Sequence, residues 1–302
     1  MQDTIQTNST GTNITSLKVL YAPLTPTTHY PGFQDFIETG IKLWNRFTLP
    51  PETTFLVYSY AEIAWAAQTI TKILVDSGSD QNRAERTGND LANAPYGSAD
   101  CGGANAGMVS NTQAIGVFAL CPRNEGTDPY YKGPLQVHEF THQIQGAQFI
   151  GSRLNQQQVM PCWISEGLAH AGGLAAGTKS LQDYLEVRKR QASSPTLRAA
   201  REYVATLIKA SDLTEEYLKK FYIESSSPNC LDLPSFSLGY SVGFLTTEAL
   251  AAIGGMESTM LLYTRTANGE TFADAFEKIY GITWSDAQSI LAKVISKQFS
   301  RL

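Results

Sequence analysis

The sequence predicts an α+β protein in which a small β-sheet is formed first along the chain and a mostly helical part follows. Segments rich in β-branched and aromatic residues alternate with helical patterns up to residue 120, whereas every later segment has helical periodicity. The 302 residues are 42% hydrophobic and 17% charged, enough to form a large core. This composition excludes a small disulfide scaffold, a collagen-like repeat and a disordered protein.

The first half of the chain is predicted element by element from local patterns. Residues 16–23 and 53–60 are expected to be strands because both are rich in β-branched and aromatic side chains. Apolar residues close to a 3.6-residue period predict helices over 31–47 and 61–75. Next comes a polar segment rich in Gly, Asn and Asp, 76–105, which we expect to be irregular and to form a rim, a lid or a surface excursion.

A further segment of strand character, Ala106–Leu120, is expected to be one bent strand or a pair of strands, either at the edge of a cleft or inside the sheet. After a turn, helical patterns continue to the end of the chain. They cover 134–149, 161–175, 179–192, 196–210, 214–224, 237–253, 257–264, 271–280 and 284–299. We therefore expect a disordered tail over 1–15, a sheet lobe over 16–155 and a helical lobe over 156–302, the two lobes forming one catalytic unit.

The charge balance argues against nucleic acid as a partner. The chain has 23 Lys and Arg against 28 Asp and Glu, a net charge of −5, and no basic run. No stretch reaches the roughly 18 apolar residues of a membrane span. The sequence does not indicate an oligomeric state.

The amino-terminal segment and the cysteines favour a secreted or extracytoplasmic protein. Asn8 and Asn13 each begin a glycosylation acceptor triplet in a polar tail, so we expect that a signal peptide has been removed. The alternative is chance triplets and buried reduced thiols. Four cysteines allow three pairings. Cys101–Cys121 with Cys162–Cys230 is preferred, because the first bond would join the two ends of the predicted strand segment and the second would tie the helix that begins near Pro161 to the downstream loop.

Residues 138–142 read His-Glu-Phe-Thr-His and lie in a predicted helix that begins near Pro134. His138 and His142 are four residues apart, so both imidazoles project from one face, as two ligands of a Zn²⁺ ion would. Glu139 follows the first histidine and could act on a water bound to that metal. The alternative is a surface helix with two ordinary histidines.

The next predicted helix contains Trp163-Ile-Ser-Glu-Gly-Leu-Ala-His170. Glu166 lies 24 positions after His142, a distance that allows a helix end, a loop and a returning helix. A carboxylate there would complete a His₂Glu site and leave the fourth position to water. Gly167 is expected to let this helix pack closely on the helix that carries the histidines. The alternative for Glu166 is a solvated helix carboxylate.

Together, HEFTHQ and WISEGLAH resemble the gluzincin metallopeptidases, and most of all their peptidase MA-like members. Two weaker similarities begin at Gly239 and Thr271. The resemblance implies one zinc per chain held by His138, His142 and Glu166, with Glu139 as general base. It also implies a thermolysin-like lobe, with a small sheet and the HExxH helix, followed by a mostly helical lobe.

Two features depart from the family pattern. The 23 residues between His142 and Glu166 are more than in the best-known gluzincins, which indicates a loop insertion. Gluzincin aminopeptidases carry a Gly-x-Met-Glu-Asn segment whose Glu binds the free amine of the substrate. The corresponding region, Gly102–Met108, has no Glu, so endopeptidase action is favoured.

Three further side chains are candidates for supporting roles. Tyr240, next to Gly239 after a Pro- and Ser-rich loop, is the preferred donor to the carbonyl oxygen, with Tyr130 and Tyr131 as substitutes. Each could instead be an ordinary tyrosine. His170 follows Glu166 by four positions and could be a ligand in place of Glu166, a partner of a ligand or a plain helix histidine.

These observations favour a zinc-dependent peptide-bond hydrolase that acts on a peptide or protein substrate, with a zinc-bound water activated by Glu139. Two alternatives stay open. The first is a non-catalytic zinc-containing binding or cell-surface protein, although such a protein would not need Glu139. The second is a zinc hydrolase of a non-peptide amide or ester, which would use the same water-activating groups.

Overall fold

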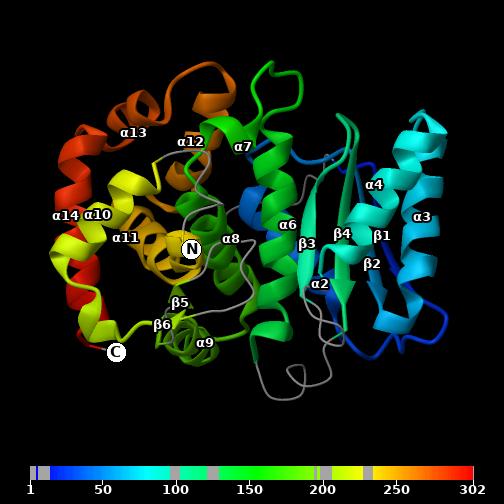
Figure 1. Cartoon of the computed structure of the whole chain (residues 1–302), viewed down its shortest axis with the longest axis horizontal. Helices are drawn as coiled ribbons and strands as arrows, with labels where there is room; N and C mark the ends of the chain where they lie inside the picture. The colour runs from blue at the N-terminus through cyan, green and yellow to red at the C-terminus, as the bar shows by residue number, and fades with distance from the viewer. Residues whose placement is uncertain are drawn as a thin grey trace.

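The computed structural model describes residue 5 and residues 14–95, 103–120, 129–193, 196–197, 206–226 and 234–301. As the sequence predicts, the fold is α+β, with the main sheet built by the first 120 residues (Figure 1). The strands of the main sheet are β1 (Ser16–Tyr21), β2 (Glu52–Tyr58), β3 (Ala104–Met108) and β4 (Gln113–Ala119).

The main sheet is mixed and has the strand order β1-β2-β4-β3. β1, β2 and β4 run parallel, with Leu56 aligned with Leu20 on one side and with Val117 on the other. β3 pairs antiparallel with β4, Gly107 opposite Ile115, and lies at one edge. The segment 106–120 is therefore a pair of strands, of which β4 is internal and β3 is the edge strand.

The central strands are buried on both faces because helices cover each side of the sheet. On one side, Leu56 and Val117 pack against α3 (Ile63–Asp76) and α4 (Gln81–Asn93). On the other side, Phe55 and Phe118 join a larger core with α2 (Phe33–Trp44) and α6 (Pro134–Ala147). That larger core continues through α8 and the helices beyond it, so the sheet and the helical part share one apolar interior.

In Figure 1, α6 lies between the sheet and the remaining helices. These are α7 (Gln156–Val159), α8 (Cys162–Gly177), α9 (Leu181–Ser193), α10 (Glu215–Glu224), α11 (Phe244–Gly254), α12 (Met256–Ala267), α13 (Phe272–Tyr280) and α14 (Trp284–Phe299). A π-helical turn, Gly239–Gly243, precedes α11. Short 3₁₀ turns lie at Tyr60–Glu62, Pro129–Tyr131, Ala210–Asp212 and Pro234–Ser237. Within the described residues, no helix has the length and apolarity that a membrane span needs.

The expectation of an irregular segment over 76–105 was wrong, since α4 occupies its middle. Asp80 caps this helix by accepting a hydrogen bond from the backbone N–H of Arg83 at 3.1 Å. Its buried face consists of Ala84, Gly88 and Ala92. A Cβ at Gly88 would lie 2.5 Å from Thr71 Oγ1, so glycine permits the close packing of α4 on α3. Small residues of this kind produce no apolar periodicity.

The predicted helix over 196–210 was also wrong where the structure describes it. Two short strands, β5 (Thr196–Leu197) and β6 (Thr206–Leu207), pair antiparallel there. Pairing between the two strands uses backbone groups that a continuous helix would have bonded internally. The expected tail over 1–15 and the turn after residue 120 lie largely outside the described residues.

Candidate functional site

The start of α6 fixes the position of the histidine motif. Gly133 has a φ of 123°, and a Cβ there would lie 2.3 Å from the backbone oxygen of Gly177, so only glycine fits. Its N–H donates to the side-chain oxygen of Gln136 at 2.8 Å, and Pro134 begins the helix. The first turn of α6 is thereby held against the end of α8.

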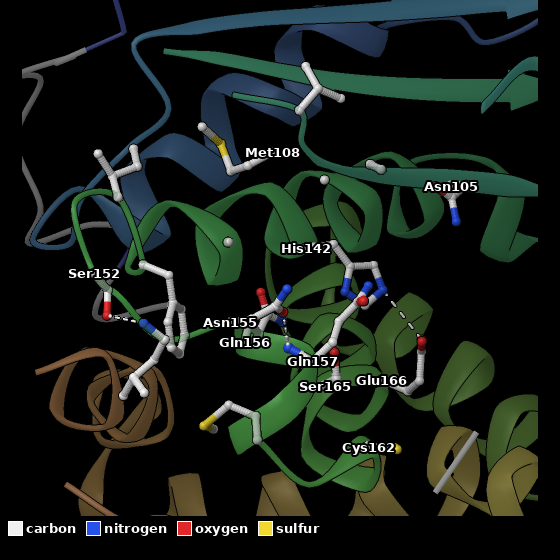
Figure 2. Close-up of a pocket in the computed structure, with 18 of the residues that line it drawn as sticks. Asn105, Met108, His142, Ser152, Asn155, Gln156, Gln157, Cys162, Ser165 and Glu166 are labelled. Carbon is white, nitrogen blue, oxygen red and sulfur yellow. Dashed lines mark hydrogen bonds and ion pairs between the residues drawn. The ribbon is translucent and has the colours of Figure 1, made fainter. Parts of the chain in front are cut away.

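The structure brings His138, His142 and Glu166 together from α6 and α8, as the sequence predicts. The two Nε2 atoms are 3.1 Å apart, and Glu166 Oε2 lies 3.5 Å from His138 Nε2 and 3.4 Å from His142 Nε2. One ligand atom from each residue lies within 4.8 Å of the other two. Figure 2 shows His142 and Glu166 approaching each other from the two helices. This is the spacing of donor atoms that one metal ion can bridge.

The three clustered residues shift one another's pKa values in different directions. Burial alone would raise the pKa of Glu166, but the two histidines hold it well below its usual range. Burial lowers the pKa of His138 to about 4. Burial would also lower the pKa of His142, but the Glu166 carboxylate outweighs it and raises that pKa to about 9. The ionised Glu166 carboxylate and the neutral His138 imidazole are the forms in which these groups bind a cation.

Buried polar atoms without partners provide an independent test of whether a metal fits. Glu166 Oε2 is buried, and it has no hydrogen-bond partner among the described residues despite its closeness to both imidazoles. Among these residues, its only stabilising contacts are the ion pairs with the two imidazoles at 3.4 and 3.5 Å, and coordination of a cation would satisfy this buried oxygen more fully. The donor set, two neutral nitrogens and one carboxylate, suits Zn²⁺. The residues present therefore fit a zinc ion.

Glu139 lies beside this cluster without belonging to it. Its Oε1 is 3.9 Å from His138 Nε2, and its side chain is buried. Burial raises the pKa of Glu139 to about 8, with Glu166 contributing in the same direction and His142 opposing it. A carboxyl group whose pKa lies near neutrality can both take up and release a proton during a reaction. The position and the pKa suit a general base.

Gln145 is a functional candidate that the sequence analysis missed. His142 Nδ1 lies 2.8 Å from Gln145 Oε1, and Gln145 Nε2 donates to the backbone oxygen of Ser165 at 2.8 Å. The amide therefore connects the second histidine to the residue that precedes Glu166. By accepting from Nδ1–H, it leaves His142 Nε2 free to bind a metal. The spacing of three residues on one helix could have identified it.

We expect Gln145→Ala to weaken zinc binding by about tenfold to a hundredfold, because His142 loses the partner that orients its ring. The zinc dissociation constant can be measured by competition with a chelating dye. Gln148→Ala is the matched control, since Gln148 directly follows α6 but its side chain donates to the backbone oxygens of Thr48 and Ile144. Equal zinc affinities in the two variants would contradict this role for Gln145.

His170 is buried behind the cluster. Its ring centroid is 4.7 Å from that of His138 and 5.0 Å from that of Tyr130, which it stacks upon. Its Nε2 lies 3.3 Å from Gln191 Oε1, and it does not belong to the group of atoms that could hold a metal. The geometry therefore fits a residue that supports His138 by packing.

Tyr240 faces the same cavity as His142 and Glu166, whereas Tyr130 and Tyr131 do not line it. Its π-helical turn packs closely on α8: a Cβ at Gly167 would lie 2.3 Å from Gly243, and one at Gly243 would lie 2.1 Å from the oxygen of Trp163.

The expectation that Gly167 packs on the histidine helix was wrong, because Gly167 contacts the π-helical turn. Gly172 and Gly173 of α8 make that contact instead, with Thr141 and His138.

The cavity beside the cluster measures about 800 Å³. The edge strand β3 forms one side, and α6 and the beginning of α8 contribute His142 and Glu166. Figure 2 shows Asn105 and Met108 across the cavity from Gln157 and Cys162. Val109 N donates to the backbone oxygen of Gln113, so Val109 and Gln113 form a hydrogen-bonded pair between β3 and β4. In an antiparallel pair of strands such pairs occur at every second residue. The backbone N–H and C=O groups of Ala106 and Met108, which lie at the intervening positions, therefore point away from β4.

Of the predicted disulfides and glycosylation sites, the structure describes only Cys162, which is disulfide-bonded. Its partner lies outside the described residues, as do Cys101, Cys121, Cys230, Asn8 and Asn13. Comparison with known proteins adds no assignment, because no protein family, curated protein or solved structure matches the chain.

Proposed function

We propose that this protein is a zinc-dependent metallopeptidase of the gluzincin type. The observation that carries the proposal is the convergence of His138, His142 and Glu166 on one point, with the Glu139 carboxyl beside it. The cluster opens on a cavity with an edge strand along one side. A small mixed sheet followed by helices is also compatible with a thermolysin-like lobe, which we include in the proposal.

The roles of the residues follow from their positions. His138, His142 and Glu166 would hold one zinc ion, which when bound polarises the scissile carbonyl and lowers the pKa of water. Glu139 takes a proton from the attacking water and later delivers it to the leaving amine. Tyr240 donates a hydrogen bond to the carbonyl oxygen as negative charge develops on it.

The edge strand β3 supports a peptide as the substrate. The outward-directed backbone groups of Ala106 and Met108 can pair with an extended chain, as in strand addition to a sheet edge. Glu166 is the only carboxylate among the described residues that line the cavity. Because Glu166 belongs to the metal cluster, no other described carboxylate is placed to bind a free amino terminus. This favours endopeptidase action.

The disulfide of Cys162 supports a secreted or extracytoplasmic location, where such bonds persist. The disulfide-bonded residue lines the cavity. We therefore expect reduction of this disulfide to impair the site as well as the fold. A secreted or extracytoplasmic location is part of the proposal.

The test is to incubate the purified protein, loaded with zinc, with a library of peptides derived from a proteome. New amino termini, mapped by mass spectrometry and abolished by a chelator, are the expected result. Hydrolysis of ester or small amide substrates without peptide cleavage would favour the non-peptide hydrolase. Stoichiometric zinc with no hydrolysis of any of these substrates would favour the non-catalytic protein.

Tyr240→Phe is expected to lower kcat by about 10²–10³ with KM little changed, because the lost hydrogen bond acts only as charge develops. Steady-state kinetics on one cleaved peptide provide the measurement. Tyr131→Phe is the control, since Tyr131 does not line the cavity. An unchanged kcat in Tyr240→Phe would exclude this tyrosine as the donor and leave the zinc and Glu139 assignments intact.

A further inference from the structure

The long spacing between His142 and Glu166 builds one wall of the cavity. Residues 149–160, which we call the wall segment, connect α6 to α8 and include α7. Eight residues of this segment line the cavity, among them Phe149, Asn155, Gln157 and Met160. The motif spacing predicts only a loop insertion here, whereas the structure places residues 149–160 along the cavity.

The wall segment is held in place by specific hydrogen bonds. Ser152 Oγ donates to the backbone oxygen of Ala267 at the end of α12 at 2.7 Å, and it accepts from the N–H of Leu154. Asn155 caps α7 by accepting from the N–H of Gln157 at 2.9 Å. Figure 2 shows Asn155, Gln156 and Gln157 grouped on one side of the cavity. A wall fixed in this way can select among substrates, since it does not adapt freely to each one.

The chemistry of the wall is apolar inside and uncharged at the rim. Leu154 is 38% exposed, Ile150 is partly exposed, and Met108 lies across from the wall on β3. Phe149 and Met160 also border the cavity but are buried in the core. Aliphatic and thioether side chains of this kind suit apolar partners of several shapes. Asn155, Gln156 and Gln157 add amides to this lining. Within the described lining, only His142 and Glu166 can carry charge, because the exposed Arg153 is not part of it.

We propose that the wall segment and Met108 form a subsite for an uncharged, apolar side chain of the peptide substrate. This inference rests on the proposed function, because it identifies the substrate class of the same site. A charged side chain would lose its hydration against Leu154, Ile150 and Met108 without meeting an opposite charge from the wall, whereas an apolar one would bury surface there. The subsite therefore acts through exclusion of charge and burial of apolar area.

The test changes the charge of the rim at two neighbouring residues of α7. Gln157 lines the cavity and Gln158 does not, although both side chains are exposed. The measured quantity is the ratio of kcat/KM for two peptides that have Asp or Lys at the position whose side chain enters the subsite. We expect Gln157→Lys to raise this Asp-to-Lys ratio about threefold to tenfold. Gln158→Lys should leave this ratio near that of the wild type. The increase should fade at high salt.

Removing apolar surface from the wall segment should lower kcat/KM for peptides with a large apolar side chain at the subsite. Leu154→Ala is expected to lower kcat/KM for a peptide with Leu at that position about tenfold relative to one with Ala, because lost contacts affect only the larger side chain. Leu154 lines the cavity and is 38% exposed, so its truncation leaves the core intact. The ratio between the two peptides is the measurement, and Gln157→Lys is the independent check.

Binding of the same peptides to the Glu139→Gln protein separates this inference from the proposed function. Fluorescence anisotropy should show tighter binding of the Leu peptide than of the Asp and Lys peptides, and a gain for the Asp peptide in Gln157→Lys. That binding pattern, together with no cleavage of the peptides by the wild-type protein, would support the subsite and contradict the peptidase. Cleavage with equal effects of Gln157→Lys and Gln158→Lys would overturn the subsite and leave the peptidase. The absence of both binding and cleavage would overturn both.

Discussion

Replacing Glu139 by Gln is expected to lower kcat by at least about 10³ while zinc stays bound. Glutamine keeps the size of the side chain but cannot accept the proton of the attacking water or return it to the leaving amine. General acid–base catalysis contributes roughly 10²–10⁴-fold, and here one carboxyl would serve in both steps. Burial raises the pKa of Glu139 to about 8, and the positive charge of a zinc ion bound beside it would lower that pKa, which leaves the carboxylate able to accept a proton near neutral pH.

The measurement is kcat on a cleaved peptide, with zinc content determined on the same samples. Because Glu139 is not one of the three clustered ligands, zinc stoichiometry should equal that of the wild type. Glu62→Gln is a matched control, since Glu62 is another buried carboxylate, held by the N–H of Leu24 and the hydroxyls of Thr25 and Ser59, away from the cluster. Retention of more than a tenth of the wild-type turnover in Glu139→Gln would overturn the mechanism.

Replacing His142 by Ala is expected to abolish stoichiometric zinc binding and activity together. The protein would lose one of three ligands, along with the connection from His142 through Gln145 to Ser165. Because zinc binds the folded protein, its loss should also lower the midpoint of thermal unfolding, and added zinc should no longer raise it. Zinc content after dialysis and unfolding with and without zinc provide the measurements.

His29→Ala is the control for this experiment, because His29 lies near Tyr30 and outside the cluster. It should keep about one zinc per chain and a zinc-dependent rise in unfolding temperature. Full zinc occupancy in both His138→Ala and His142→Ala would remove the basis for a metal site at this position. Loss of zinc in both, with the fold retained, would support it.

Some parts of this protein follow from local sequence because they depend on periodicity alone. Helical spacing places His138 and His142 one turn apart on α6, whatever the rest of the chain does. The strand at β2 follows from a run of β-branched and aromatic residues. The existence of a later helix with Glu166 followed by Gly167 is equally a local property. These features gave the α+β class and the candidate ligands.

Other parts of the structure depend on which segments pack against each other, and the local sequence pattern does not predict them. α4 was missed because its buried face is made of small residues, and only the approach of α3 at Gly88 explains them. Gly167 was assigned to the wrong contact, since either neighbouring helix could have used a glycine there. The pairing of β5 with β6 likewise required a partner strand that local periodicity does not identify.

The sequence by itself thus determined which residues could bind a metal and which carboxyl could act as a base, because their spacing on two helices fixes those options. Only the tertiary structure decided that Glu166 reaches both histidines, that Gln145 Oε1 lies 2.8 Å from His142 Nδ1, and that Tyr240 rather than Tyr130 or Tyr131 lines the cavity. Each of these depends on how α6, α8 and the π-helical turn approach one another. That approach is set by glycine contacts between segments far apart in the chain, which no local pattern encodes.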